Sequence, residues 1–270
     1  MGAPKEELEN YRTFAQRLTE AARGRTLAHF RKQATVFNKA GVLFDPVTDA
    51  DREAERAQRD MIRSVYPEHG VLGEEFGERV EEGPWRWVLD PVDGTRAFVC
   101  GIPSWTTLIA LEYDSHSVLG IIDQPFTDEQ WTACFGETVY MRGGSHFSCK
   151  TSDTTEISKA RISTTDPRPS GYFNEREAEV FESIAVDARL ARFSLDAYAY
   201  GLLACGELDV VLETTLQRHD WAALVPVIEG AGGVATNWNG EPVGKDDRGE
   251  ILAAATPELH SEVLERLRRV

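Results

Sequence analysis

Two hydrophobic patterns follow one another in the first half of the chain. Apolar positions recur with helical spacing over residues 5–32 and again over 49–66, where Thr48 is a favourable N-cap and Pro67 ends the helix. Short apolar runs between turn residues then predict the strands of an antiparallel sheet. These runs cover residues 71–73, 85–89, 105–112, 117–122 and 130–135.

The pattern changes after a polar segment at 143–158, which we expect to separate an N-terminal α+β subdomain (1–150) from a C-terminal α/β subdomain (151–270). Beyond it, strands and helices alternate, which is typical of the α/β class. The expected strands cover 161–164, 190–193, 208–213 and 251–255, and the expected helices cover 174–185, 196–206, 220–230 and 256–269.

Composition narrows the classes of partner. The formal net charge is −16, from 45 acidic and 29 basic residues. This argues against a nucleic acid partner, because phosphate backbones are bound by clustered Lys and Arg. No apolar run approaches the ~20 residues that span a bilayer, and the N-terminus has no apolar signal segment. We therefore expect no membrane partner, a cytoplasmic location, and four reduced cysteines.

The segment 85–98 (WRWVLDPVDGTRAF) contains the strongest chemical signal. Asp93 follows Asp90 by three residues across a proline, so a tight turn can direct both carboxylates toward one point. Gly94 and Thr95 open a short helix, whose free N–H groups suit a phosphate. Carboxylates beside a phosphate are compatible when a hard cation such as Mg²⁺ joins them. The alternative is a turn that two aspartates merely cap.

Other acidic residues stand at the ends of expected elements. Glu74 and Glu75 follow the strand 71–73. Asp220 opens the expected helix 220–230, where an N-cap is its simpler interpretation. Asp51 lies in the first turn of the second helix, where acids also favour the helix dipole. Each position has a purely structural reading, and only the combination indicates a metal site.

In this order the chain contains the segments VTDAD (47–51), GEE (73–75), DPVDGT (90–95), HDWAA (219–223) and GAGG (230–233). Together they resemble the motifs of the inositol monophosphatase superfamily over nearly the whole chain. The resemblance implies a layered α/β/α/β/α sandwich and a homodimer. It also implies Mg²⁺-dependent hydrolysis of small phosphate monoesters, often inhibited by Li⁺.

The resemblance assigns roles to individual residues. The expected ligands of two or three Mg²⁺ ions per subunit are Glu74, Asp90, the carbonyl of Val92, Asp93 and Asp220. Glu74 and Thr95 are expected to position and deprotonate the attacking water, with Asp51 orienting the Thr95 hydroxyl. The expected phosphate and substrate site comprises Asp93, Gly94, Thr95, Arg192, Asp196, Glu213 and Asp220.

The substrate is expected to be L-histidinol phosphate. The GTxNF pattern of inositol phosphatases is absent, since the chain has Gly94-Thr95-Arg96-Ala97-Phe98. Segments 96–111 and 192–213 instead resemble the histidinol-phosphate phosphatase branch. Asp196 and Glu213 would then pair with the ammonium of histidinol, unless both simply face solvent at the ends of their elements. Arg192 is a further candidate, although it could instead brace an acid or a neighbouring subunit.

Other functions remain as alternatives. Inositol 1-phosphate and adenosine 3′,5′-bisphosphate are the alternative substrates, and a non-enzymatic metal-binding regulator is the alternative from another class. The six histidines show no HxxxH pair, which argues against a zinc hydrolase. Asp49-Ala50-Asp51 stands at a helix start rather than after an apolar strand, so we do not expect an aspartyl-phosphate intermediate.

Overall fold

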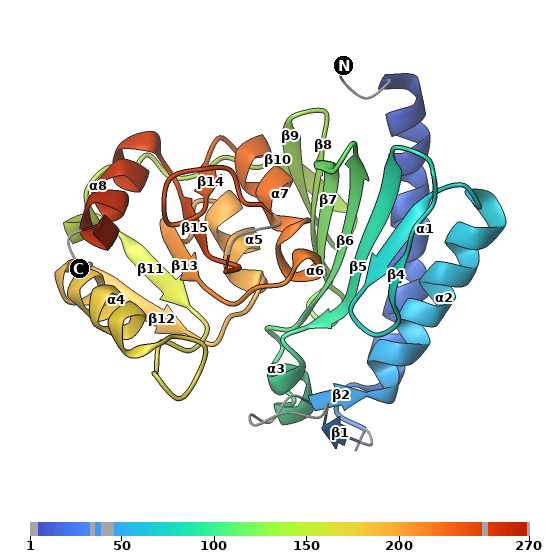
Figure 1. Ribbon diagram of the computed structural model, residues 1–270, viewed down its shortest axis with the longest axis horizontal. Coiled ribbons are helices and arrows are strands. Elements are labelled where there is room, and N and C mark those ends of the chain that lie inside the picture. Colours follow the sequence, from blue (N-terminus) through green and yellow to red (C-terminus); the bar gives the residue numbers. More distant parts are fainter. Residues whose placement is uncertain (1–4, 33–35, 39–45, 245–247, 269–270) are drawn as a thin grey trace.

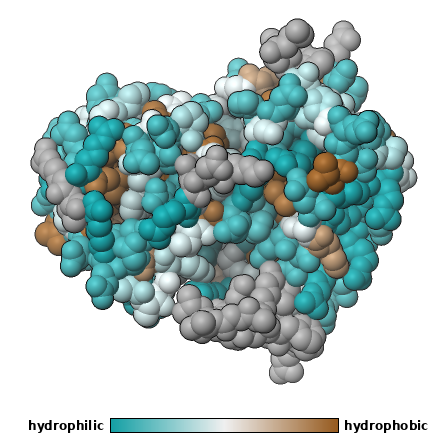
Figure 2. Space-filling view, in the orientation of Figure 1, coloured by the Kyte–Doolittle hydropathy of each residue, from teal (hydrophilic) through white to brown (hydrophobic). Residues whose placement is uncertain are grey.

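Five layers of helices and sheets make up the computed structural model, which describes residues 5–32, 36–38, 46–244 and 248–268. Figure 1 shows them side by side: α1 and α2, a first sheet, α5 and α7, a second sheet, and α4 with α8. The expected α/β/α/β/α sandwich is therefore confirmed. In Figure 2, hydrophilic residues cover most of the visible face.

The first sheet has eight strands in the order β10-β9-β8-β7-β6-β5-β3-β4. It is antiparallel, as expected, except where β3 and β5 run parallel. Its strands are β3 (Gly70–Gly73), β4 (Gly77–Arg79), β5 (Trp85–Asp93), β6 (Thr106–Tyr113), β7 (His116–Gln124), β8 (Glu129–Cys134), β9 (Glu137–Arg142) and β10 (Ser145–Ser148). The sequence did not predict β4, β9 or β10. The edge strands β4 and β10 are largely exposed and lack an apolar run, whereas β9 has an apolar run at 139–141 that could have been recognised.

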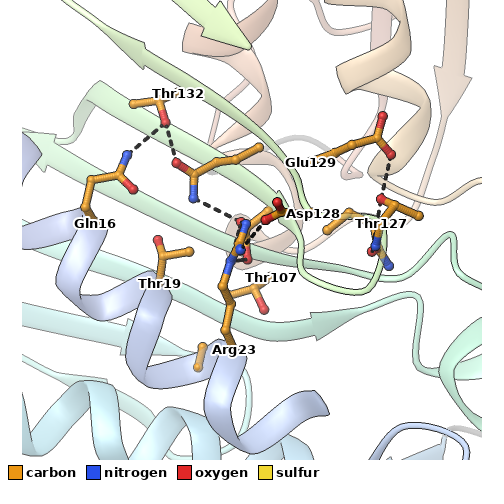
Figure 3. Close-up of polar contacts among 12 residues, drawn as sticks. Gln16, Thr19, Arg23, Thr107, Thr127, Asp128, Glu129 and Thr132 are labelled. Carbon is orange, nitrogen blue, oxygen red and sulfur yellow. Dashed lines mark hydrogen bonds and ion pairs between the residues drawn. The ribbon is translucent and has the colours of Figure 1, made fainter. Parts of the chain in front are cut away.

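Two helices cover the outer face of this sheet. They are α1 (Lys5–His29) and α2 (Asp49–Val65), and they follow the two-stranded pair β1 (Val36–Asn38) and β2 (Pro46–Thr48). Leu18 and Ile62 from the helices pack against Trp87 in a fully buried cluster. Arg23 of α1 forms a second tie, since it donates to Asp123 of β7 at 2.6 Å and to Asp128, just before β8, at 2.9 Å (Figure 3). Both contacts fix α1 and α2 to one face.

The second sheet has five strands in the order β12-β11-β13-β15-β14, with β12, β11 and β13 parallel. Its strands are β11 (Arg161–Thr164), β12 (Leu190–Phe193), β13 (Val210–Glu213), β14 (Val234–Thr236) and β15 (Ile251–Ala254). Its outer face is covered by α4 (Glu175–Asp187) and α8 (Pro257–Arg268). The 3₁₀ turn η1 (Ile157–Lys159) leads into the sheet.

A common core joins the two sheets. The helices α5 (Tyr198–Ala204) and α7 (Leu224–Gly230) lie between them. One buried cluster contains Trp131 from the first sheet, Leu203 and Val227 from these helices, and Val211 from the second sheet. The predicted division at residue 150 therefore stays a prediction, since the two halves share this core.

Two predicted helices differ from those observed. The expected helix 220–230 is divided into α6 (Arg218–Trp221) and α7, because Pro226 has no N–H to donate to the carbonyl of Ala222. Asp220 is thus the third residue of α6 and does not open a long helix. The helix expected from residue 196 begins at Tyr198, since Asp196 adopts a left-handed φ of 50°.

Within these described ranges, none of the helices has the length and apolar character needed to cross a membrane.

Candidate active site

The turn after β5 brings two aspartates together. Pro91 cannot donate a ladder hydrogen bond, and the pairing of β5 with β6 shifts register between Asp90 and Asp93. The N–H of Val92 donates to Asp90 Oδ1 at 3.1 Å. The N–H of Ala197, from the second half of the chain, donates to Asp93 Oδ2 at 2.8 Å. The backbone therefore fixes both carboxylates before any ligand binds.

The short helix α6 supplies the third aspartate. Gln217 is its N-cap, and the N–H of Gln217 donates to Asp220 Oδ2 at 2.6 Å. Arg218 of the same helix donates to buried Glu112 Oε1 on β6 at 2.6 Å, which ties α6 to the first sheet. Asp90, Asp93 and Asp220 each present a carboxylate oxygen, and these oxygens lie within 4.8 Å of one another.

A second acidic group lies where β3 ends and α2 begins. Asp51, Glu74 and Glu75 offer carboxylate oxygens within 4.8 Å of one another. The Thr48 N–H and hydroxyl donate to Asp51 Oδ2 at 2.9 and 2.5 Å, as the reciprocal half of a capping box. Both groups of acids are oxygen-only donor sets, which fit a hard divalent cation such as Mg²⁺.

The loop of Gly94 and Thr95 faces the same space. Gly94 has a φ of 77°, and a Cβ there would lie 2.9 Å from Asp196 Oδ2, so only glycine fits without strain. The Thr95 hydroxyl donates to the Val92 carbonyl at 3.1 Å. In the described part of the chain no hydrogen bond joins Asp51 to this hydroxyl, so the expected orientation of Thr95 by Asp51 stays a prediction.

A cavity of about 460 Å³ is lined by the three aspartates, by Glu74 and by the Gly94–Thr95 loop, whereas Asp51 and Glu75 are not among its lining residues. Besides Glu74, Asp90, Val92, Asp93, Gly94, Thr95 and Asp220, its lining includes Arg96, Thr165, Tyr172, Asp196, Tyr200, Glu213, Thr214 and His219. Glu213 is buried and accepts a hydrogen bond from the Thr165 hydroxyl at 2.8 Å. Most of the expected site residues therefore meet in one cavity, built from both halves of the chain.

Arg192 is placed differently. It lies on the outermost strand of the second sheet, where it is exposed, and it is not among the residues that line the cavity. The sequence analysis also missed several lining residues. Thr165 could have been found, because β11 and β13 are parallel and their carboxyl ends, which lead to Thr165 and Glu213, meet at one sheet edge.

Burial and mutual repulsion favour the neutral form of these acids. Burial raises the pKa of Asp90 well above its ordinary value, and repulsion by Glu74, Asp93 and Asp220 raises it further. The pKa of Asp93 is raised in the same way, by burial and then by Asp196 and Asp220. A divalent cation among them would remove this repulsion and favour the charged forms.

The pKa values of the neighbouring acids are also raised. Burial raises the pKa of Glu213 to about 8 and that of Asp51 to about 7. Burial raises the pKa of Asp196 to about 6, although the nearby Arg96 opposes the shift. Clustered perturbed carboxyls in a cavity are a mark of functional sites.

Comparison with known proteins agrees with this site. A model of the inositol monophosphatase family matches residues 7–270. The chain is 34% identical over 270 residues to the chloroplastic bifunctional phosphatase IMPL2 of Arabidopsis thaliana, covering 97% of this chain and 76% of that protein. It is 33% identical over 243 residues to a histidinol-phosphatase of Chlorobaculum parvum, covering 88% and 90% of the two chains.

A solved structure shares the fold as well. An inositol monophosphatase from Zymomonas mobilis superimposes with a TM-score of 0.84 and 36% identity, covering 96% of this chain and 98% of that one. The family is metal-dependent, and the acidic groups described above suit a metal. The chain therefore belongs to the inositol monophosphatase family and is a phosphoric monoester hydrolase.

Proposed function

We propose that the protein hydrolyses L-histidinol phosphate to L-histidinol and phosphate, with Mg²⁺ as its metal. The observation that carries this proposal is the acidic wall of the cavity, where Asp196 and Glu213 stand beyond the aspartates of the β5 turn. Histidinol carries an ammonium group, and buried carboxylates are its strongest hydrogen-bonding partners. Binding a cation there would also favour the charged forms of two acids whose pKa burial raises.

Each group has a role in this proposal. Asp90, Asp93, Asp220, Glu74 and the Val92 carbonyl would hold the metal, which when bound would activate a water and stabilise the charge of the leaving oxygen. The N–H groups of Gly94 and Thr95 orient the phosphate. Glu74 takes the proton of the attacking water, and the Thr95 hydroxyl, already fixed on the Val92 carbonyl, positions that water.

The role of Thr95 can be tested by itself. Thr95→Ala should lower kcat by ~10²-fold with little change in KM, because positioned proton transfer contributes about that much. Thr95→Ser keeps the hydroxyl and should keep most of the activity. Equal behaviour of the two variants would mean that Thr95 only begins α3 (Thr95–Cys100).

Inositol 1-phosphate is the second candidate, supported by the similarity to the Zymomonas mobilis protein. In that case Glu213 and Thr165 would accept hydrogen bonds from ring hydroxyls, and Asp196 would have no cationic partner. Adenosine 3′,5′-bisphosphate is a third ester of suitable class. A non-enzymatic regulator would hold metal in the same cavity without turnover.

One panel of assays separates these candidates. We would measure kcat/KM for L-histidinol phosphate, inositol 1-phosphate and adenosine 3′,5′-bisphosphate, with Mg²⁺ and with a chelator. The proposal expects turnover that requires the metal and favours L-histidinol phosphate. A preference for inositol 1-phosphate at matched Mg²⁺ would contradict the substrate, and turnover of none would contradict the enzymatic reading.

Substitution of the acidic wall sharpens the result. Asp196→Asn or Glu213→Gln should lower kcat/KM for L-histidinol phosphate by ~10- to 100-fold, which corresponds to the loss of one charge-assisted hydrogen bond. An uncharged ester should be affected much less. The homodimer and inhibition by Li⁺ remain predictions from the resemblance, and the cytoplasmic location remains a prediction from composition.

A further inference from the structure

Tyr200 is a buried cavity residue for which the structure shows no internal partner. It lies on α5, its side chain is 1% exposed, and it lines the cavity. Its hydroxyl has no hydrogen-bond partner in the part of the chain that the structure describes. Buried hydroxyls in folded proteins are nearly always paired, because losing water without a replacement costs free energy. An unpaired hydroxyl in a cavity wall is therefore best explained by a ligand.

The surroundings of Tyr200 indicate what the hydroxyl does. Burial raises the pKa of Tyr200, and Glu213, Asp93 and Asp220, which line the same cavity, raise it further. The phenol consequently stays protonated and keeps its donor. Tyr200 thus shares the cavity wall with one residue of the acidic wall and with two of the expected metal ligands.

We propose that the Tyr200 hydroxyl hydrogen-bonds the leaving group of the bound ester, at a polar atom beyond the ester oxygen. Tyr200 is then a specificity-determining residue. It favours esters whose leaving group carries a hydroxyl or a ring nitrogen in addition to the ester oxygen. The inference rests on the proposed phosphatase function but does not depend on which ester is preferred.

Tyr198 on the same helix provides a matched control. Its hydroxyl donates to Glu129 Oε2 at 2.7 Å, so its partner lies inside the protein. It is not among the residues that line the cavity. A Tyr→Phe substitution removes the hydroxyl and keeps the ring and its position on the helix. The two variants differ in what is lost: Tyr198 loses a hydrogen bond inside the protein, whereas Tyr200 has no such bond to lose in the described residues.

The two variants should behave in opposite ways. Tyr200→Phe should keep or raise the Tm of the metal-free protein, because an unsatisfied polar group is removed. It should lower kcat/KM for the preferred ester of the panel by ~3- to 10-fold, mostly through KM, the scale of one neutral hydrogen bond. Tyr198→Phe should lower Tm and leave kcat/KM unchanged.

Methyl phosphate completes the test, because its leaving group has no polar atom beyond the ester oxygen. Tyr200→Phe should hydrolyse it as the wild type does. Wild-type kcat/KM for the preferred ester would overturn the inference, as would an equal loss on methyl phosphate. If the wild-type enzyme prefers another ester, only the histidinol proposal is contradicted. The Tyr200 variants are then compared on that preferred ester. Wild type without any turnover overturns both.

Discussion

Buried carboxylates occur in two kinds of surroundings in this protein. Outside the cavity most of them are balanced by arginine. Asp123 is fully buried on β7, and Arg23 of α1 contacts it at 2.6 Å, in the network of Figure 3. Other buried acids paired with arginine are Glu55 with Arg59, Glu112 with Arg86 and Arg218, Glu177 with Arg248, and Asp209 with Arg161.

The acids that line the cavity differ, because the following three have no Lys or Arg partner in the described residues. Asp90, Asp93 and Glu213 accept hydrogen bonds from backbone N–H groups or threonine hydroxyls. In the described residues none of these three acids forms an ion pair with Lys or Arg. Glu129 is also buried without an Arg or Lys ion pair in the described residues, but it accepts hydrogen bonds from three hydroxyls. The acids of the cavity differ because several of them lie together, and such a cluster favours a cation from solution.

The largest expected effect comes from removing an unbalanced charge. Asp93→Asn should lower turnover at saturating Mg²⁺ by more than ~100-fold, since even residues around metal ligands contribute up to that much. The metal-free protein should stay folded and keep or gain stability, because repulsion by Asp196 and Asp220 is relieved. Activity and thermal denaturation with chelator give the two readouts. Near-wild-type kcat at saturating Mg²⁺ would show that Asp93 is not a ligand.

Breaking a balanced pair should have the opposite signature. Arg23→Met leaves Asp123 buried without its cation, and we expect a loss of ~3–5 kcal/mol in the free energy of unfolding. The folded fraction should keep its kcat. Urea denaturation measures the loss, and Arg12→Met serves as control, since the Arg12–Glu9 pair is exposed and should cost less than ~1 kcal/mol. Equal losses in both variants would remove the distinction between buried and exposed pairs.

Glu55 connects the two kinds of acid. It is buried beside Arg59, and its carboxylate accepts the N–H groups of Glu75 at 2.7 Å and Phe76 at 3.2 Å. The loop that carries Glu74 is therefore held by a balanced acid. Glu55→Gln should raise the Mg²⁺ concentration for half-maximal activity by ~10-fold and preserve kcat at saturation.

The control for this prediction is Glu53→Gln, on the exposed side of the same helix. It should leave the Mg²⁺ requirement unchanged. If Glu55→Gln lowered Tm but not the apparent affinity for Mg²⁺, its carboxylate would only stabilise the fold.

A smaller effect should appear in the pH dependence of stability. Asp51, Asp196 and Glu213 have pKa values raised to about 7, 6 and 8, so the folded protein binds protons more tightly than the unfolded chain. Stability of the metal-free protein should therefore fall as pH rises from ~4 to ~8. Burial also raises the pKa of Asp123 to about 6, despite Arg23, and this contributes in the same direction.

Mg²⁺ should distinguish these contributions. It should raise Tm more at pH 8 than at pH 5, because it binds the charged acids of the cavity and has no access to Asp123. A Tm that Mg²⁺ shifts equally at both pH values would contradict the assignment of the raised pKa values to a metal-binding site.

The sequence predicted what depends on neighbouring residues. Pro91 and Gly94 define the β5 turn locally, and the apolar runs define the central strands. What it did not predict depends on contacts between distant segments. The edge position of Arg192 follows from the order of strands, and the unpaired hydroxyl of Tyr200 follows from how α5 meets two sheets. The division of the helix could have been predicted from Pro226, because proline lacks the N–H that a continuous helix requires.

The construction of the cavity from both sheets has a consequence for synthesis of the chain. Asp90 and Asp93 leave the ribosome with the first sheet, whereas Asp220 follows only after β13 has been made. The emerging first sheet can therefore form while only part of the acidic cluster exists, before repulsion from the remaining acids opposes it. A metal site that needs all three aspartates can therefore form only after Asp220 has been synthesised.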